Sequence, residues 1–245
     1  MPEKEILLQL KNIHVYYGGI RALDGINLTL RQGEIVAVMG PNGSGKSTIL
    51  KTIFGLAPIF TGDVFWHKQR ITPVAYKMVE RGISFVPQGH QVFKNLTVRE
   101  NLEIGAYTIN NNLIKKKMTE VLEIFPILKL KLNDNSDSLS VGQQQMLAIA
   151  RGLMIEPKIL LLDEPTLGLS PKIVKEVLQK IKQINEQQKT TIIMVEHNIK
   201  SVLDVADLAY VIDKGKVVWT DKAEKLRNNN VLKEVFTGQK LTNFN

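Results

Sequence analysis

The stretch GPNGSGKST, residues 40–48, constrains the fold of this chain more than any other segment. Its three glycines lie within six residues, although glycine loses more backbone freedom on folding than any other residue. The apolar run EIVAVM ends directly before it, and STILKTIFGL after it has apolar residues at helical spacing. The sequence therefore predicts a tight turn that joins a buried strand to a helix.

This turn fits the pattern G-x-x-x-x-G-K-[ST] of a phosphate-binding loop, or P-loop. Glycines let successive backbone N–H groups point at phosphate oxygens, and the N-terminus of the next helix adds partial positive charge. Lys46 would reach the β- and γ-phosphates of a nucleotide, and the Ser47 hydroxyl would bind Mg²⁺. The alternative is a glycine-rich turn that binds nothing. The predicted phosphate-binding residues are Gly40, Pro41, Asn42, Gly43, Ser44, Gly45, Lys46, Ser47 and Thr48.

Two adjacent carboxylates follow the apolar run KILLLD. A continuous apolar run is typical of a parallel strand that is buried on both faces, and open α/β sheets hold ligands at the carboxyl ends of such strands. The two carboxylates would repel each other there without a cation. We therefore predict that Asp163 binds Mg²⁺ and that Glu164 positions or deprotonates the attacking water. The alternatives are a helix N-cap for Asp163 and a surface charge for Glu164.

A further candidate anion site lies in DSLSVGQQQMLAIARGLM. Ser140 and Gln143 have the spacing of a capping box, and apolar residues follow at helical spacing. Gly142 would then lie at an exposed helix N-terminus, which suits an anion. Ordinary helix capping explains the same pattern.

The remaining pattern is that of an α/β core with a helical insertion. Helical patterns dominate residues 89–155, and strands then alternate with helices up to a predicted hairpin, YVIDKGKVVW. A length of 245 residues, 44% of them hydrophobic, suits one such domain. The sequence contains no cysteine, which excludes disulfides and thiolate metal sites. No apolar run approaches the ~20 residues of a membrane-spanning helix, and the N-terminus does not resemble a signal peptide.

The formal net charge of +8 has two interpretations. A polyanion such as nucleic acid, a membrane surface or a nucleotide could lie nearby, or the lysines could simply cover a solvated surface. The only dense run of lysines is 115–117.

The segment LSVGQQQ, residues 139–145, resembles the signature motif of ATP-binding-cassette (ABC) ATPases, whose usual form is L-S-G-G-Q. The P-loop, this segment and LLLDEP occur in the order and spacing of that family. The resemblance covers essentially the whole chain. It implies an α/β fold with a P-loop NTPase (RecA-like) core, an antiparallel β subdomain and an inserted α-helical subdomain. The expected core is residues 1–88 and 156–222, the helical subdomain 89–155 and a helical tail 223–245.

The resemblance also implies roles for single residues. Tyr17 matches the aromatic residue that stacks on adenine, and Gln88 matches the Q-loop glutamine, which touches Mg²⁺ and the attacking water. His197 matches the switch histidine that contacts the γ-phosphate. The catalytic residues would be Glu164, His197 and Gln88, the metal ligands Ser47, Gln88 and Asp163, and the signature residues Ser140, Gly142 and Gln143, acting on the ATP of a second subunit. Without the resemblance, Tyr17 could be a strand aromatic, Gln88 a loop residue and His197 a hydrogen-bonded histidine.

Two positions depart from the family pattern. Val141 replaces the first glycine of the signature, and Ser170 stands where many members have aspartate. EPTLGLSP and the VGQQQMLAIARGLM helix are similar to the LivF-type ATPases of branched-chain amino acid importers, with related importers carrying urea or amides. Many LivF-type proteins have glutamate where this chain has Gln88.

The resemblance implies ATP and Mg²⁺ as cofactors and several protein partners. These are a second ATPase subunit, identical or a sister chain, two membrane-spanning permease subunits and, indirectly, a solute-binding protein. The chain would then lie peripherally at the cytoplasmic face of the inner membrane, with no nucleic acid bound. The alternatives are the ATPase of a lipopolysaccharide-type exporter and a soluble ABC ATPase that works on nucleic acid.

Overall fold

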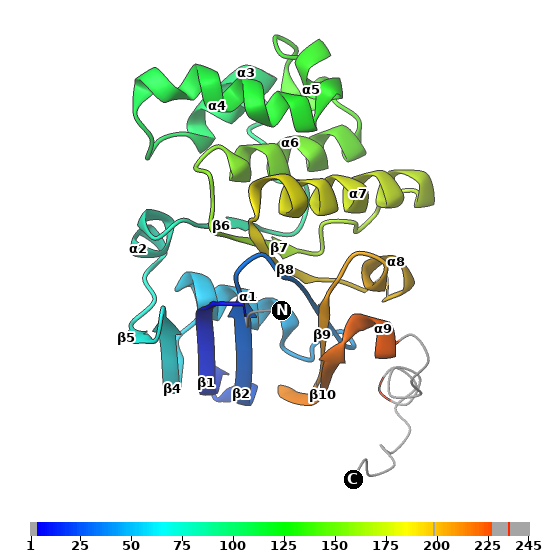
Figure 1. Ribbon diagram of the computed structural model, residues 1–245. Coiled ribbons are helices and arrows are strands. Elements are labelled where there is room, and N and C mark those ends of the chain that lie inside the picture. The colour runs from blue at the N-terminus through cyan, green and yellow to red at the C-terminus, as the bar shows by residue number, and fades with distance from the viewer. Residues whose placement is uncertain (1–3, 198, 227–234, 236–245) are drawn as a thin grey trace.

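A computed structural model describes residues 4–197, 199–226 and 235 of the chain, which form two β-sheets and surrounding helices (Figure 1). The smaller sheet has the strand order β2-β1-β4-β5 and is antiparallel throughout. Its strands are β1 (Ile6–Tyr17), β2 (Ile20–Arg31), β4 (Ile59–Trp66) and β5 (Gln69–Ile71). It is the antiparallel β unit that the sequence resemblance implied.

The larger sheet has the order β10-β9-β3-β8-β7-β6 and is parallel except at its edge, where β10 runs antiparallel to β9. Every residue of its strands β3, β7 and β8 is buried, so their continuous apolar sequences match strands covered on both faces. The strands are β3 (Ile35–Met39), β6 (Ile83–Val86), β7 (Ile159–Asp163), β8 (Thr191–Val195), β9 (Leu208–Asp213) and β10 (Lys216–Lys222).

Helices cover the larger sheet and extend from it at one end of the molecule (Figure 1). Helices α3 to α6 gather at that end and fall within the predicted insertion of residues 89–155. The helices are α1 (Lys46–Phe54), α2 (Ala75–Glu80), α3 (Val98–Gly105), α4 (Asn111–Ile124), α5 (Pro126–Leu130), α6 (Val141–Leu153), α7 (Pro171–Gln188), α8 (Ile199–Leu203) and α9 (Ala223–Leu226).

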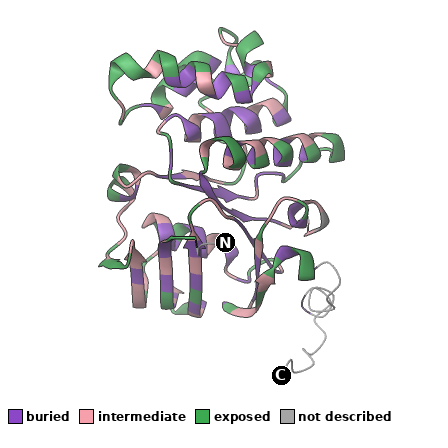
Figure 2. Cartoon of the chain, viewed as in Figure 1, coloured by how far each residue is buried: buried purple, intermediate pink, exposed green. Residues whose placement is uncertain are grey.

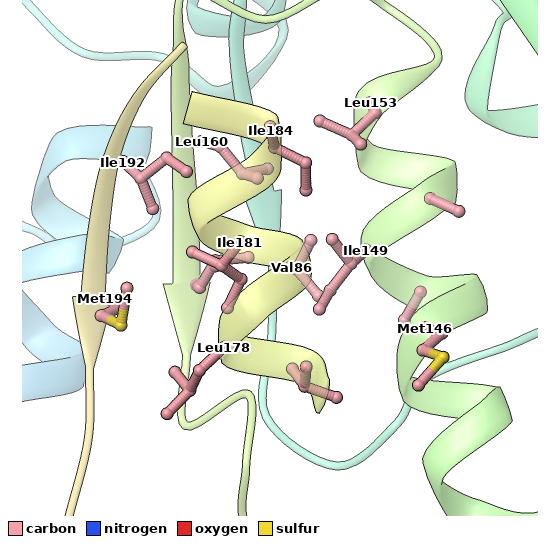
Figure 3. Packing of buried hydrophobic residues seen from close by; sticks show 14 of the residues in the cluster. Val86, Met146, Ile149, Leu153, Leu160, Leu178, Ile181, Ile184, Ile192 and Met194 are labelled. Atoms are coloured by element: carbon pink, nitrogen blue, oxygen red, sulfur yellow. The ribbon is translucent and has the colours of Figure 1, made fainter. Parts of the chain in front are cut away.

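Two apolar clusters lie on opposite faces of the larger sheet. Because side chains alternate along a strand, Leu160 of β7 packs toward α6 and α7, whereas Leu161 belongs to the cluster with α1 and the smaller sheet. Figure 3 shows the first cluster, in which Ile181 of α7 lies between the strands and Ile149 of α6. Figure 2 shows the central strands coloured largely as buried. Packing on both faces holds the strands in place, and with them the strand ends at which the candidate site residues lie.

The local structure goes beyond the sequence pattern at several places. Gly62 lies inside β4 at a φ of 103°, against the backbone of Asn12. Strand β5 and helix α2 had no clear sequence signal. In the predicted tail helix, α9 ends at Leu226, and residues 227–234 and 236–245 lie outside the described part of the chain. Among the described residues, no helix combines the length and apolarity needed to cross a membrane.

Candidate functional site

Residues 40–45 of the P-loop connect β3 to α1, and residues 46–48 form the first turn of that helix, as the sequence predicted. Gly45 is the N-cap of α1 with a φ of 102°. A Cβ atom on Gly45 would lie 2.6 Å from the carbonyl oxygen of Ala22, and one on Gly40 would lie 2.0 Å from that of Ile212. Both distances are far too short for a side chain, and backbone atoms cannot move aside cheaply. Close backbone approach therefore requires two of the three P-loop glycines.

A pocket of about 640 Å³ lies over the N-terminus of α1. Its volume is within the usual range of small-molecule sites. Gly40, Pro41 and Ser44 do not line it, and the Ser44 side chain is buried away from it. These three predicted phosphate-binding residues therefore shape the loop rather than the surface of the pocket. The pocket is lined by Asn42, Gly43, Gly45, Lys46, Ser47 and Thr48 of the P-loop, with Ala22, Gln88, Glu164, Leu167 and His197.

Lys46 lies at the floor of this pocket. Its ammonium group donates hydrogen bonds to the carbonyl oxygens of Gly40 at 2.9 Å and Pro41 at 2.8 Å. Burial lowers the pKa of Lys46, and the nearby carboxylates of Glu164 and Asp163 partly oppose that shift. The residue is therefore a buried cation, anchored within the loop that the sequence predicts to bind phosphate.

Asp163 and Ser47 form the candidate magnesium site. The Ser47 hydroxyl donates a 2.7 Å hydrogen bond to Oδ1 of Asp163, at the end of β7. Burial raises the pKa of Asp163, and the Ser47 hydrogen bond partly offsets the effect, so a bound cation would stabilise the charged form. Within the described residues, no three His, Cys, Asp or Glu side chains are placed so that they could hold a metal ion together. A hydroxyl with a single carboxylate fits Mg²⁺, which takes oxygen ligands and keeps waters and phosphates in its shell.

Glu164 is the centre of the three predicted catalytic residues. Its Oε1 atom lies 2.7 Å from Nε2 of His197, and its Oε2 atom accepts a 2.9 Å hydrogen bond from the Gln88 amide. Only 9% of the Glu164 side chain is exposed. The backbone at Glu164 has a φ of 50°, which is uncommon for a residue with a side chain and frequent at functional sites. The structure thus brings Glu164, His197 and Gln88 together at the pocket.

Sequence reasoning missed two residues that hold the turn after Glu164. Glu196 is buried at the end of β8, and its carboxylate accepts a 2.8 Å hydrogen bond from the backbone N–H of Thr166. His90 Nε2 donates to the carbonyl oxygen of Leu167 at 3.1 Å. Glu196 directly follows the apolar run TTIIMV, so its strand-end position was the available signal. Nothing in the local sequence marks His90.

Tyr17 does not line the pocket. It ends β1, pairs with Ile20 across the turn to β2, and is 41% exposed. Ala22, further along β2, is the pocket residue that the smaller sheet supplies. The aromatic ring is therefore exposed, and its stacking on adenine stays a prediction.

The signature residues lie at the N-terminus of α6, with Ser140 as its N-cap, and none of them lines the pocket of the same chain. Ser140 and Gln143 form the predicted capping box, since each side chain bonds the backbone N–H of the other residue. Gly142 was predicted at an exposed helix end, and that is wrong for the residue itself. It is buried, and a Cβ there would lie 2.7 Å from Cγ2 of Ile173 on α7. A side chain at this position would therefore require Ile173 to shift.

Comparison with known proteins decides the family. Residues 23–167, more than half of the chain, match the family model described as ABC transporter. The chain belongs to the ABC transporter family. It is 37% identical to the high-affinity branched-chain amino acid transport ATP-binding protein BraG of Pseudomonas aeruginosa, across 95% of this chain and 100% of the relative. The probable LivF protein of Archaeoglobus fulgidus is 36% identical over 95% of this chain and 99% of its own.

Other relatives have different cargo. A probable sulfate/thiosulfate import ATP-binding protein, CysA of Chlorella vulgaris, is 33% identical over 90% of this chain and 93% of that protein. The comparisons therefore identify the family but do not agree on the transported solute.

Solved structures agree with the family. The ADP conformation of an ATP-binding cassette of an ABC transporter superposes with a TM-score of 0.85 at 28% identity, over 94% of this chain and 95% of that one. A dimeric post-hydrolysis cassette bound to ADP and Pi has a TM-score of 0.78 at 31% identity, over 89% and 99% of the two chains. The predicted ABC ATPase fold is confirmed, and the chain is an ATP-hydrolysing subunit of an ABC transporter.

Proposed function

We propose that this ABC ATPase powers the import of branched-chain amino acids, with urea or amide import as the related possibility. One observation carries the proposal: the BraG and LivF relatives align along essentially their whole length at 36–37% identity. The sulfate/thiosulfate relative is only a few per cent less similar. The cargo therefore has to be tested against sulfate as well.

The proposed hydrolysis assigns roles to the ionisable and polar side chains in and beside the pocket. Glu164 holds the attacking water and accepts its proton, while His197 and Gln88 fix the orientation of the carboxylate. Lys46 neutralises charge on the β- and γ-phosphates, and backbone N–H groups of the P-loop bind their oxygens. Ser47, Asp163 and the side-chain oxygen of Gln88 would hold Mg²⁺, which would neutralise charge that develops on the phosphates.

The signature helix acts in the proposal on the ATP of a second subunit. Ser140, Gly142 and Gln143 do not line the pocket of their own chain, and a solved relative is a dimer bound to ADP and Pi. Each ATP would then lie between the P-loop of one subunit and the α6 N-terminus of the other, whose positive end suits the γ-phosphate. The adenine would stack on Tyr17, which is accessible at the end of β1. The second subunit is a copy of this chain or a sister ATPase.

Two membrane-spanning permease subunits complete the proposal. A groove of about 280 Å³ between the core and the helical end has largely apolar walls. Tyr107 is 70% exposed there, and the Arg151 guanidinium lies 5.0 Å from the ring centre of Phe93. Burial lowers the pKa of Arg151, so the groove offers a partly desolvated cation among apolar side chains. A permease segment would dock in this groove, the chain would lie peripherally at the cytoplasmic face of the inner membrane, and a solute-binding protein would deliver cargo to the permeases.

Uptake measurements test this function. Cells that lack the chain would be complemented with wild type or with Glu164→Gln, and uptake of labelled leucine, urea, an amide and sulfate would be compared. We expect loss of leucine uptake that only wild type restores. Selective loss of urea, amide or sulfate uptake would identify that solute as the cargo instead and would leave the proposed mechanism unchanged. Unchanged uptake of all four, in a strain that also lacks sister ATPases, would refute an import function and favour an exporter or a soluble ABC ATPase.

A further inference from the structure

The turn between β9 and β10 touches both the P-loop and strand β2. The backbone N–H of Gly215 in this turn donates a 3.0 Å hydrogen bond to the carbonyl oxygen of Ser44. The carbonyl oxygen of Gly215 accepts a 2.8 Å hydrogen bond from the N–H of Asp24 in β2. One buried residue thus joins the phosphate-binding loop to the smaller sheet through both of its backbone polar groups.

No residue other than glycine fits this position without a shift of backbone atoms. Gly215 has a φ of 79°, and a Cβ on it would lie 2.8 Å from the carbonyl oxygen of Ala22 and 3.2 Å from Cα of Leu23. A Cβ on Gly45 would approach the same Ala22 oxygen at 2.6 Å. The P-loop and the β9–β10 turn therefore both pack directly against the backbone of β2 at Ala22, which lines the nucleotide pocket.

Charged side chains reinforce the contact between β2 and the turn. The Asp24 carboxylate lies 3.2 Å from the ammonium of Lys216, 3.1 Å from the guanidinium of Arg21 and 3.4 Å from Nδ1 of His14. Desolvation acts to raise the pKa of Asp24, but the Lys216 hydrogen bond and the charges of Arg21, Lys216 and His14 together lower it. Because Lys216 directly follows Gly215, this cluster holds β2 against the turn through a second set of contacts.

The position of β2 matters because the smaller sheet carries the adenine side of the proposed site. Tyr17 pairs with Ile20 at the end of the β1–β2 hairpin, and Ala22 follows on β2. An ATP molecule has a limited reach between its base and its phosphates. It binds at both places only where the hairpin and the P-loop have the correct spacing.

We propose that Gly215 is a positioning residue for nucleotide binding, which sets the spacing between the Tyr17 end of the β1–β2 hairpin and the P-loop. This inference rests on the proposed stacking of adenine on Tyr17. It assigns to the β9–β10 turn a specific role in base recognition, although no atom of the turn lines the pocket.

Two ligands separate this role from a general effect on the P-loop. ATP needs both the base site and the phosphate site, whereas inorganic tripolyphosphate needs only the phosphate site. We expect Gly215→Ala to weaken ATP binding at least tenfold and tripolyphosphate binding less than threefold, as measured by calorimetry on the full chain. Equal losses for the two ligands, or no loss for either, would overturn the proposal.

A matched control measures how much backbone strain alone changes the affinity. Gly33 also has a positive φ, 66°, but the nearest atom to a Cβ there is the carbonyl oxygen of Lys189 at 3.8 Å, and the residue lies away from the nucleotide pocket. Gly33→Ala should leave the affinity for both ligands unchanged. A selective loss of ATP affinity in Gly33→Ala would attribute the effect to strain and would contradict the proposal.

Two variants that keep Gly215 test the proposal even if Gly215→Ala does not fold. Asp24→Asn and Lys216→Ala weaken the same junction and should each reduce ATP affinity about two- to fivefold, with tripolyphosphate affinity retained. Lys182→Ala removes an exposed lysine that pairs with Glu186 on α7, and it should change neither affinity. Unchanged ATP affinity in both junction variants would count against the proposal.

The Tyr17→Ala variant identifies which part of the reasoning fails. It should lower ATP affinity, spare tripolyphosphate and add little further loss when combined with Gly215→Ala. If Tyr17→Ala binds ATP as wild type does, the base site of the proposed function is wrong. If Tyr17→Ala has the expected effect and Gly215→Ala does not, only the positioning role of Gly215 is wrong.

Discussion

Replacing Glu164 by glutamine should separate ATP hydrolysis from ATP binding. In the wild-type chain, the two carboxylate oxygens face His197 Nε2 at 2.7 Å and the Gln88 amide at 2.9 Å. A glutamine has one acceptor oxygen and one NH₂ donor, so at most one of the two hydrogen bonds is lost, at a cost of about 0.5–1.5 kcal/mol, and a change of the His197 tautomer or a turn of the Gln88 amide would restore it. For a chain of this size, that loss lowers Tm by only about 2–4 °C per kcal/mol. The variant should therefore fold.

The loss of hydrolysis should be much larger than the loss of stability. Removing a general base typically lowers the rate about 10²–10⁴-fold, which corresponds to about 2.7–5.4 kcal/mol of transition-state stabilisation. ATP affinity should stay equal or increase, because Glu164 contributes negative charge beside Lys46 at the phosphate site. Single-turnover hydrolysis and equilibrium ATP binding, measured on the same preparation, distinguish the two effects.

Glu156 offers a matched control for this substitution. Glu156 also has a positive φ, 53°, and its carboxylate lies 3.3 Å from the Lys117 ammonium, away from the nucleotide pocket. Glu156→Gln should hydrolyse ATP at the wild-type rate. If Glu164→Gln binds ATP and hydrolyses it within threefold of wild type, the base lies elsewhere and the reasoning from the His197–Glu164–Gln88 cluster is refuted.

Three further predictions concern packing, pH and magnesium. Gly142→Ala should destabilise the fold by about 1–3 kcal/mol through overlap with Ile173, and Ile173→Ala in the same chain should restore much of that loss in urea unfolding. Burial raises the pKa of Glu34, so its stabilising protonated form is lost as the pH rises through that raised pKa. Glu34→Gln should thus unfold at higher urea than wild type at pH 7.5, with a smaller difference at pH 4.5. Ser47→Ala removes the hydroxyl bonded to Asp163 and should raise the Mg²⁺ concentration for half-maximal hydrolysis about tenfold, whereas an unchanged magnesium titration would contradict the assigned ligand.

The sequence predicted best what depends on neighbours in the chain. The strand, turn and helix around the P-loop follow from apolar runs and from glycines, and the capping box of Ser140 follows from residue spacing. Of the three catalytic candidates, Glu164 came from its position after a buried strand, whereas Gln88 and His197 came from resemblance to a family. Their mutual contacts were accessible only from the structure, because Gln88, Glu164 and His197 lie on segments far apart in sequence.

Contacts between distant backbone segments escaped prediction altogether. The Lys-Gly turn of the last hairpin was recognised, but its hydrogen bonds to Ser44 and Asp24 were not, since a turn sequence does not specify what the turn packs against. Glu196 and His90 were missed for the same reason. Each side chain forms a hydrogen bond with a backbone group of the turn after Glu164. Every residue has such backbone groups, so the sequence of the turn does not show which side chain will bond to it.

The replacement of a signature glycine by Val141 is also explained by contacts that only the structure shows. The family pattern has two adjacent glycines, and only one of them is replaced here. Val141 is the first residue of α6 and is 49% exposed, so its side chain extends from the helix without a clash within the chain. Gly142 lies against Ile173, and a methyl group there would lie 2.7 Å from Cγ2 of Ile173 unless that side chain shifts. The substitution therefore occurs where the isolated chain tolerates a side chain, and its consequence falls on the proposed partner subunit, which would meet the valine at the ATP interface.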